Sequence, residues 1–208
     1  MEVTPYQIDV LKELINIGVG RAAGILNRML RYHIVLQVPD VRILTQKELN
    51  VQTANLGEDN LAAVEMAFCG AFSGTAALIF SSRSASKLVS ILVDDHSVST
   101  ADFDLLRIGT LQEVGNIVLN GVMGSIANIL NQPVDYAPPS FEEGRFESMG
   151  LWQAAEPDAT VLLAQTHFSI QQVLIEGDII IIFEVGAFDV LLSHIHGMIA
   201  DHAEYHKG

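Results

Sequence analysis

Apolar residues recur at helical spacing in two long stretches of the chain, 5–31 and 100–131. In each stretch the apolar positions gather on one side and leave the opposite side polar, which is typical of a helix with one buried face. The residues expected on the two buried faces are Leu11, Leu14, Ala22, Ile25 and Met29 in the first stretch, and Leu111, Val114, Val118, Val122 and Ile129 in the second. The pattern predicts two long amphipathic helices.

The start of the first helix is marked by a capping box. Thr4 is suited to the N-cap position, and Gln7 can bond back to it. Gly18, Gly20 and Gly24 would each weaken an isolated helix by about 1 kcal/mol relative to Ala. We therefore expect another element to approach closely along the glycine side.

Between and after these helices, shorter segments have the apolar and β-branched composition of strands. The predicted strands are 32–38 with a continuation at 41–44, 61–72, 75–80, 160–170, 172–175 and 179–184. Ser73-Gly74 and Gly177-Asp178 are predicted hairpin turns. Two shorter helices are predicted, at 84–93 with Ser84 as its cap and at 188–200, and 142–156 is predicted to be an acidic loop.

The order of these elements is the same in the two halves of the chain. The long helices correspond at an offset of 100 residues, and the segments GTAALIF and GDIIIIF correspond at an offset of 103. The order predicts an α/β fold of the α+β type: one internally duplicated, pseudo-two-fold domain with long helices on a largely antiparallel sheet. Its repeats would span about 1–98 and 99–208, with the boundary at 94–100.

Composition and charge limit the partners of this domain. Of the 208 residues half are hydrophobic, and the formal net charge of −14 disfavours nucleic acid or anionic lipid as a partner. The segment 114–134 lacks charged residues but holds five amide side chains, so we expect a buried helix and no membrane insertion. Those five residues are Asn116, Asn120, Asn128, Asn131 and Gln132.

The single cysteine, Cys69, lies in the apolar stretch MAFCGAF and is expected to be a buried structural thiol. One cysteine forms no intrachain disulfide, and the polar, acidic start of the chain does not read as a signal peptide, so we expect a cytoplasmic protein. His202 and His206 have a spacing that can bind metal, but only Asp201 and Glu204 stand near them and no HExxH motif occurs, so we interpret them as part of a frayed tail.

The most specific pattern is a polar motif that occurs once on each long helix. The first copy has Asp9, Glu13, Asn16 and, after 22 further residues, Pro39; the second has Gly109, Glu113, Asn116 and, after 22 further residues, Pro139. Residues three and four apart share one helix face, so each helix presents a carboxylate and a carboxamide opposite its buried side. Asn27 and Asn120 lie along the same polar stripes and are interpreted as packing or surface groups.

The motif resembles the signature of the CheC/CheX/FliY family of chemotaxis phosphatases, and the duplicated layout is closest to CheC. The resemblance implies an enzyme that hydrolyses the phospho-aspartate of a CheY-like response regulator. It implies that Glu13 and Glu113 dock the regulator and that Asn16 and Asn116 orient the attacking water. Asp9, Pro39 and Pro139 would support the sites, and Gly109 makes the second copy less complete than the first.

The resemblance also implies that the chain binds no cofactor of its own, since Mg²⁺ would be held by the regulator. The chemistry is plausible on general grounds, because an acyl phosphate is already reactive and a neutral carboxamide can position water without repelling the phosphoryl group. On this reading, replacing Asn16 and Asn116 together by Ala abolishes phosphatase activity and leaves the fold intact.

Two alternatives from other functional classes remain open. One is a module of the same fold that binds a regulator, or the deamidase CheD, without efficient turnover. The other is a dimerising scaffold at the flagellar switch. The sequence allows a monomer or a homodimer.

Overall fold

The computed structural model describes residues 3–30, 33–45, 47–49, 60–93, 100–150, 159–170 and 173–205. Its helices are α1 (Pro5–Leu30), α3 (Ser82–Leu92), α4 (Thr100–Ile129) and α6 (Ala187–Tyr205), with a 3₁₀ turn, η1 (Phe146–Ser148). Its strands are β1 (Ile34–Thr45), β2 (Leu61–Gly70), β3 (Gly74–Ser81), β4 (Val134–Tyr136), β5 (Ser140–Gly144), β6 (Thr160–Ile170) and β7 (Val173–Phe183).

The strands form one seven-stranded sheet in the order β1-β6-β7-β3-β2-β4, with β5 also paired to β2. All the strand pairs are antiparallel, which confirms the predicted fold class. The two hairpins, β2-β3 and β6-β7, meet at the centre through β3 and β7. The strand that follows each long helix pairs with the hairpin of the other half of the chain. The two halves therefore share one sheet.

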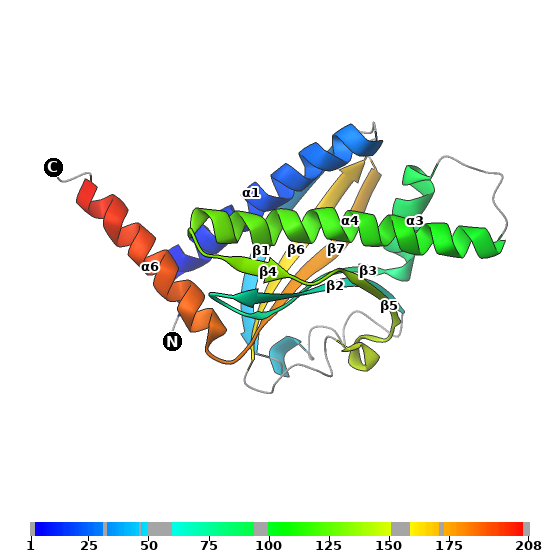
Figure 1. The fold of residues 1–208 in the computed structure, drawn as a ribbon. Helices are drawn as coiled ribbons and strands as arrows, with labels where there is room; N and C mark the ends of the chain where they lie inside the picture. The colour runs from blue at the N-terminus through cyan, green and yellow to red at the C-terminus, as the bar shows by residue number, and fades with distance from the viewer. Residues whose placement is uncertain are drawn as a thin grey trace.

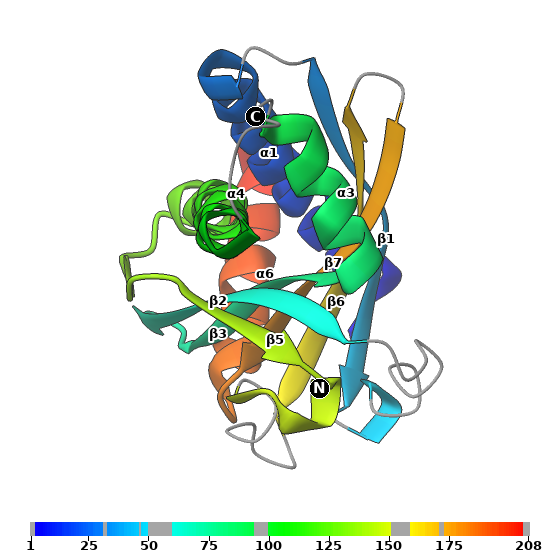
Figure 2. The same cartoon turned by 90° about the vertical axis from the view of Figure 1, so that its right-hand side faces the viewer.

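The helices α1, α3 and α4 cover one face of this sheet, and α1 and α4 run in opposite directions against each other (Figure 1). The view in Figure 2 shows α3 and α4 on the same side of the curved sheet, and Figure 1 shows α6 leading away from the end of the molecule opposite α3. No helix in the described part of the chain combines the length and hydropathy that a membrane-spanning helix needs.

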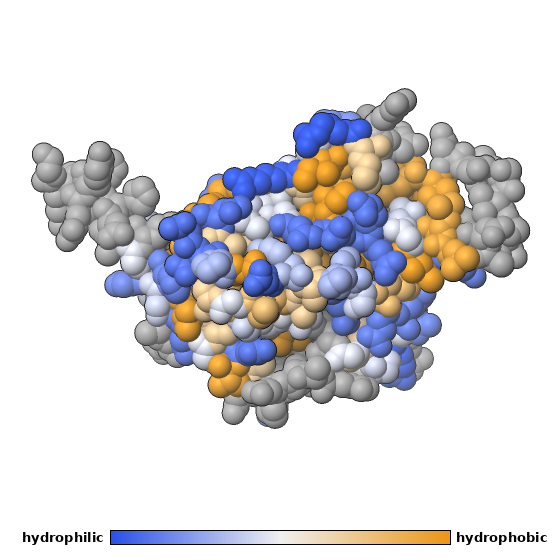
Figure 3. Space-filling view, viewed as in Figure 1, coloured by the Kyte–Doolittle hydropathy of each residue, from blue (hydrophilic) through white to orange (hydrophobic). Residues whose placement is uncertain are grey.

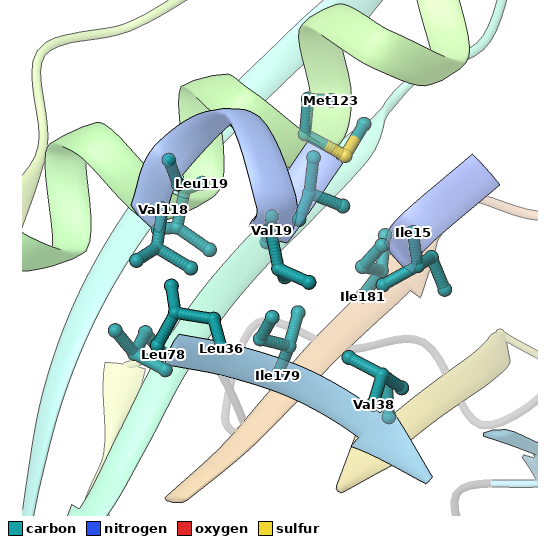
Figure 4. Packing of buried hydrophobic residues seen from close by; sticks show 14 of the residues in the cluster. Ile15, Val19, Leu36, Val38, Leu78, Val118, Leu119, Met123, Ile179 and Ile181 are labelled. Carbon is teal, nitrogen blue, oxygen red and sulfur yellow. The ribbon is translucent and has the colours of Figure 1, made fainter. Parts of the chain in front are cut away.

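The larger core lies between the sheet and these helices. In Figure 4, Val19 of α1 lies above Ile179 and Ile15 lies beside Ile181, and Val118 and Met123 of α4 belong to the same cluster. Alternate residues of the central strands point to the opposite face of the sheet, as the two-residue period of a strand requires. There they form a smaller cluster with residues of the connecting segments, including Leu49, Phe146 and Met149.

The long helices and most strands lie where the sequence predicts them. The capping box is present, since Gln7 N–H donates to Thr4 Oγ1 (3.2 Å) and Thr4 N–H donates to Gln7 Oε1 (2.9 Å). The predicted close approach holds for Gly18, because a Cβ atom there would lie 2.5 Å from Val122 Cα. It is wrong for Gly20, where such an atom would meet nothing within 4 Å, and for Gly24, where it would meet only the Arg28 side chain of the same helix at 3.9 Å.

Five further details differ from the sequence predictions. Gly177 and Asp178 form no turn but lie within β7, opposite Thr166 and Gln165 of β6. Gly177 is needed there because a Cβ atom would lie 2.6 Å from the Phe80 ring. The cap of α3 is not Ser84 but Ser81, whose hydroxyl accepts a hydrogen bond from the Ser84 N–H.

The segment 142–156 is not a loop throughout, since 142–144 complete β5 and 146–148 form η1. Cys69 is exposed rather than buried, because its neighbour Phe68 takes the core position on β2 and Cys69 points to the opposite side at the end of the strand. Ile25 and Met29, predicted to be buried, are 41% and 48% exposed, because the packed face of α1 in this region runs through Ala22, Ala23 and Leu26 instead. The segment 94–99 and His206 lie outside the described residues.

Candidate functional site on the two long helices

The structure places both copies of the motif on outward faces of the long helices. Glu13 of α1 and Glu113 of α4 are exposed, and Asn16 and Asn116 are half-buried one turn further along. Each carboxylate and carboxamide pair is separated by about 4.5 Å along its helix axis. The two copies occupy equivalent positions but differ in their hydrogen bonds.

In the first copy, the carboxamide of Asn16 is bound to the backbone of β1. Its Oδ1 accepts from Val38 N–H (3.1 Å), and its Nδ2 donates to Val38 O (3.3 Å) and Lys12 O (3.0 Å). Val38 is free to make these bonds because the β1–β6 register shifts between Gln37 and Asp40. The donors of Asn16 are thus fully used within the protein.

Two further side chains of α1 reinforce this connection. The Lys12 amine donates to Pro39 O, and Asn27 pairs with the backbone N–H and C=O of Ile34. The polar stripe of α1 is therefore a row of side chains that holds β1 in place, and Asn27 is a packing group, as predicted.

The second copy lacks this row of contacts. At the positions that correspond to Lys12, Asn27 and Val38, the second half has Gln112, Ala127 and Pro138. Proline has no N–H, so the bond that Val38 donates to Asn16 has no counterpart at Pro138. The strand β4 instead pairs with β2, and Ala137 N–H donates to Ala67 O (2.9 Å).

In place of a strand, Asn120 is the partner of Asn116. The Asn120 Nδ2 donates to Asn116 Oδ1 (2.6 Å) and to Asn116 O (2.8 Å). Among the described residues no group accepts a hydrogen bond from Asn116 Nδ2, and Glu113 makes neither a hydrogen bond nor an ion pair. The carboxamide and carboxylate of the second copy are therefore available to a bound partner.

The surroundings of the second copy are anchored by an ion pair one and a half turns before Glu113. Arg107 donates to Glu143 of β5 through both Nη atoms (2.8 and 2.9 Å). These hydrogen bonds from Arg107 lower the pKa of Glu143 below its ordinary value. The pair fixes α4 to the edge strand and leaves Glu113 as an unpaired carboxylate at the surface.

The first motif position, which is Asp9 in one copy and Gly109 in the other, is exposed to solvent in both helices. Asp9 is exposed, and a Cβ atom at Gly109 would meet nothing within 4 Å. Next to Gly109 on the same face of α4, Leu105 is 72% exposed. Figure 3 shows hydrophobic surface at this end of the molecule, beside the more hydrophilic middle of the view.

Sequence reasoning identified both motifs but did not find the partners that distinguish them. The signal was present in the aligned halves, where Val38 corresponds to Pro138 and Gly20 to Asn120. A helical spacing of four residues also marks Asn116 and Asn120 as potential partners.

No family model matches the chain. Several solved structures do. FliY of Thermotoga maritima is 17% identical with a TM-score of 0.75 over 95% of this chain and 100% of that chain. The FliM middle domain of H. pylori is 14% identical with a TM-score of 0.62 over 92% and 99%.

CheX of Borrelia burgdorferi, in its complex with CheY, BeF3 and Mg²⁺, is 18% identical with a TM-score of 0.55 over 83% of this chain and 99% of that chain. These three similarities cover 83–95% of this chain and 99–100% of the chains in the matched structures. The chain therefore has the fold of the CheC/CheX/FliY type of chemotaxis proteins.

Proposed function

We propose that this protein is a phosphatase that hydrolyses the phospho-aspartate of a CheY-like response regulator, with Glu113 and Asn116 as its principal site. The observation that carries the proposal is the free face of Asn116, whose Nδ2 has no acceptor among the described residues and which lies beside the unpaired carboxylate of Glu113. The fold supports the same class of protein, since CheX, which shares it, forms a complex with CheY.

In this mechanism Asn116 orients the water that attacks the phosphorus atom. Its carboxamide can donate a hydrogen bond to the water oxygen and, through its second lone pair on Oδ1, accept one from the water. It is neutral, so it does not repel the phosphoryl group. The acyl phosphate and the Mg²⁺ that binds it would belong to the regulator. This chain would therefore orient the attacking water and would not supply a nucleophile of its own.

Glu113 and the surface around it would dock the regulator. An exposed carboxylate can form a charge-assisted hydrogen bond with a cationic side chain of the partner, such as a lysine. Exposed Leu105 lies on the same face of α4, two turns before Glu113, and adds an apolar contact for the partner. The net charge of −14 favours a docking partner with basic groups on its surface.

The first copy is proposed to have mainly a structural role. For Asn16 to orient a water, it must give up bonds to Val38 and Lys12, each worth about 1 kcal/mol. The more complete motif is thus the less available site, and activity is proposed to depend on Asn116 alone.

The proposal is tested by phosphate release from a phosphorylated CheY-like regulator with Mg²⁺ present. We expect Asn116→Ala to lower the accelerated rate by at least about 100-fold, the range typical of groups that assist proton transfer and orientation. Glu113→Gln is expected to raise KM for the regulator. Asn16→Ala is the matched control and is expected to keep the rate within about twofold at a temperature where it is folded.

A second candidate is a module that binds a regulator or another chemotaxis protein such as CheD without turnover. Two observations favour it: the hydrogen bonds that hold Asn16, and the similarity to FliM of H. pylori in its complexes with FliG and with SpeE. Binding of the phosphorylated regulator with no acceleration of phosphate release by the unmodified protein would select this candidate and reject the phosphatase.

A further inference from the structure

The hydrogen bond between Asn120 and Asn116 gives a role to a residue outside the motif. Asn120 lies one helical turn after Asn116, and its Nδ2 is 2.6 Å from Asn116 Oδ1 and 2.8 Å from Asn116 O. One donor group therefore bonds both the side chain and the backbone of Asn116. This pair of bonds fixes where Asn120 lies and, through it, which way the Asn116 carboxamide faces.

The bond determines which end of the Asn116 carboxamide is presented outward. An asparagine side chain on a helix surface otherwise samples several rotamers, and its terminal torsion is broad. With Oδ1 directed at Asn120, the Nδ2 group is left on the side away from Asn120, and Oδ1 keeps one lone pair. Asn116 is thus held in one orientation without losing the donors it needs for a water.

The first half of the chain shows what replaces this arrangement. The residue that corresponds to Asn120 is Gly20, which has no side chain and around which a Cβ atom would meet nothing within 4 Å. There the carboxamide of Asn16 is fixed by Val38 instead, through bonds that use its donors. Each asparagine is therefore held, but only the one held by another asparagine keeps its Nδ2 donors free.

We propose that Asn120 is a positioning residue for Asn116, an inference that rests on the phosphatase function proposed above. It touches neither the water nor the regulator, and it acts by limiting the rotation of the group that does. Its loss lowers kcat, because misorientation of a positioning group weakens the reactive geometry, and leaves KM unchanged, because docking depends on Glu113.

The test compares Asn120→Ala and Asn120→Gln in the phosphate-release assay with the full chain. We expect Asn120→Ala to lower kcat about tenfold with KM unchanged. Asn120→Gln is expected to restore most of the rate, because a glutamine can bond an asparagine four residues away on a helix. The matched control is Asn128→Ala, an exposed asparagine two turns further along α4, which should leave both constants unchanged.

A second measurement reports on the order of the Asn116 side chain. In NMR spectra of the unliganded protein, the side-chain amide of Asn116 should be ordered in the unmodified chain and in Asn120→Gln, and more mobile in Asn120→Ala. If Asn116→Ala is inactive while Asn120→Ala keeps full kcat and an ordered Asn116 amide, the positioning role is wrong and the phosphatase proposal stands. If the unmodified protein releases no phosphate, both proposals fall.

Discussion

The two halves of this chain carry the same motif on the same kind of helix, yet they use it differently. In the first half, the side chains of Lys12, Asn16 and Asn27 hold the following strand against α1. In the second half, the following strand is held by β2, and among the described residues Asn116 pairs only with Asn120. The two copies of the motif thus contain the same asparagine, but its hydrogen-bond partners differ. These partners determine whether the asparagine holds a strand in place or can contact a bound molecule.

The largest expected effect concerns the contact between the halves, where α1 and α4 touch at Gly18 and Gly121. A Cβ atom at Gly18 would lie 2.5 Å from Val122 Cα and 2.7 Å from Gly121 O, both backbone atoms. We expect Gly18→Ala to lower the free energy of unfolding by about 3 kcal/mol, at the upper end of overpacking costs, in urea denaturation. Gly20→Ala, in open space, should instead raise it by up to about 1 kcal/mol.

The second prediction separates the two asparagines by stability. Asn16→Ala leaves the Val38 N–H without its partner in a buried setting, so we expect a loss of about 2 kcal/mol in the free energy of unfolding. Asn116→Ala removes a surface bond and should cost less than about 0.5 kcal/mol. Equal losses in the two variants, measured by urea titration, would remove the distinction between the halves.

The third prediction gives the first half the residues that the second half has around its motif asparagine. The substitutions Lys12→Gln, Gly20→Asn and Val38→Pro are combined in the Asn116→Ala protein, so that only Asn16 can act. We expect phosphate release to rise about tenfold over Asn116→Ala alone, which corresponds to about 1.4 kcal/mol.

The control for this rebuilt protein adds Asn16→Ala, which should abolish the gain. A rebuilt protein that folds, as judged by circular dichroism, but shows no gain would mean that the bond from the Val38 N–H to Asn16 Oδ1 is not what limits the first site.

The smallest expected effect on stability comes from Asp178. Its counterpart in the other hairpin is Thr75, which carries no charge. Burial, aided by Glu176, raises the pKa of Asp178 to about 6, although Arg42 and His167 partly oppose this. Between pH 4 and 6 the folded protein holds a proton that the unfolded chain has released, so Asp178 lowers stability as the pH rises through this window.

Asp178→Thr should therefore raise the free energy of unfolding at pH 7.5 by on the order of 1 kcal/mol, and the gain should shrink towards pH 4. Urea titrations at several pH values measure this dependence. Asp135→Asn, an exposed carboxylate on β4, serves as the control and should give no such trend. A gain that is independent of pH would assign the effect to packing instead of charge.

Much of the fold follows from local patterns in the sequence. The helical period places α1 and α4, and Thr4 and Gln7 mark where α1 begins. The hairpin turn at Gly177-Asp178 was predicted wrongly because a glycine next to an aspartate is typical of turns, whereas here the glycine makes room for the Phe80 ring from a distant strand. Such tertiary requirements are not visible in a local window.

The same limit applies to the candidate site. Glu13, Asn16, Glu113 and Asn116 could be selected from spacing alone, because helix geometry fixes which side chains share a face. Whether Asn16 is available depends on a register shift in β1 that turns Val38 towards α1. That shift results from the pairing of β1 with β6, which is distant in sequence.

The exchange of strands between the halves also has a consequence for how the chain is made. The strand β1 pairs with β6, which follows more than 100 residues later, and the β2-β3 hairpin pairs with β7, which follows roughly 90 residues after β3. At a synthesis rate of about 5–20 residues per second, on the order of 5–20 s pass before the second half has been made. During that time the strand edges of the first half are unpaired. Non-local pairing of this kind also slows folding, so the first half is the part of the nascent protein that most needs protection from aggregation.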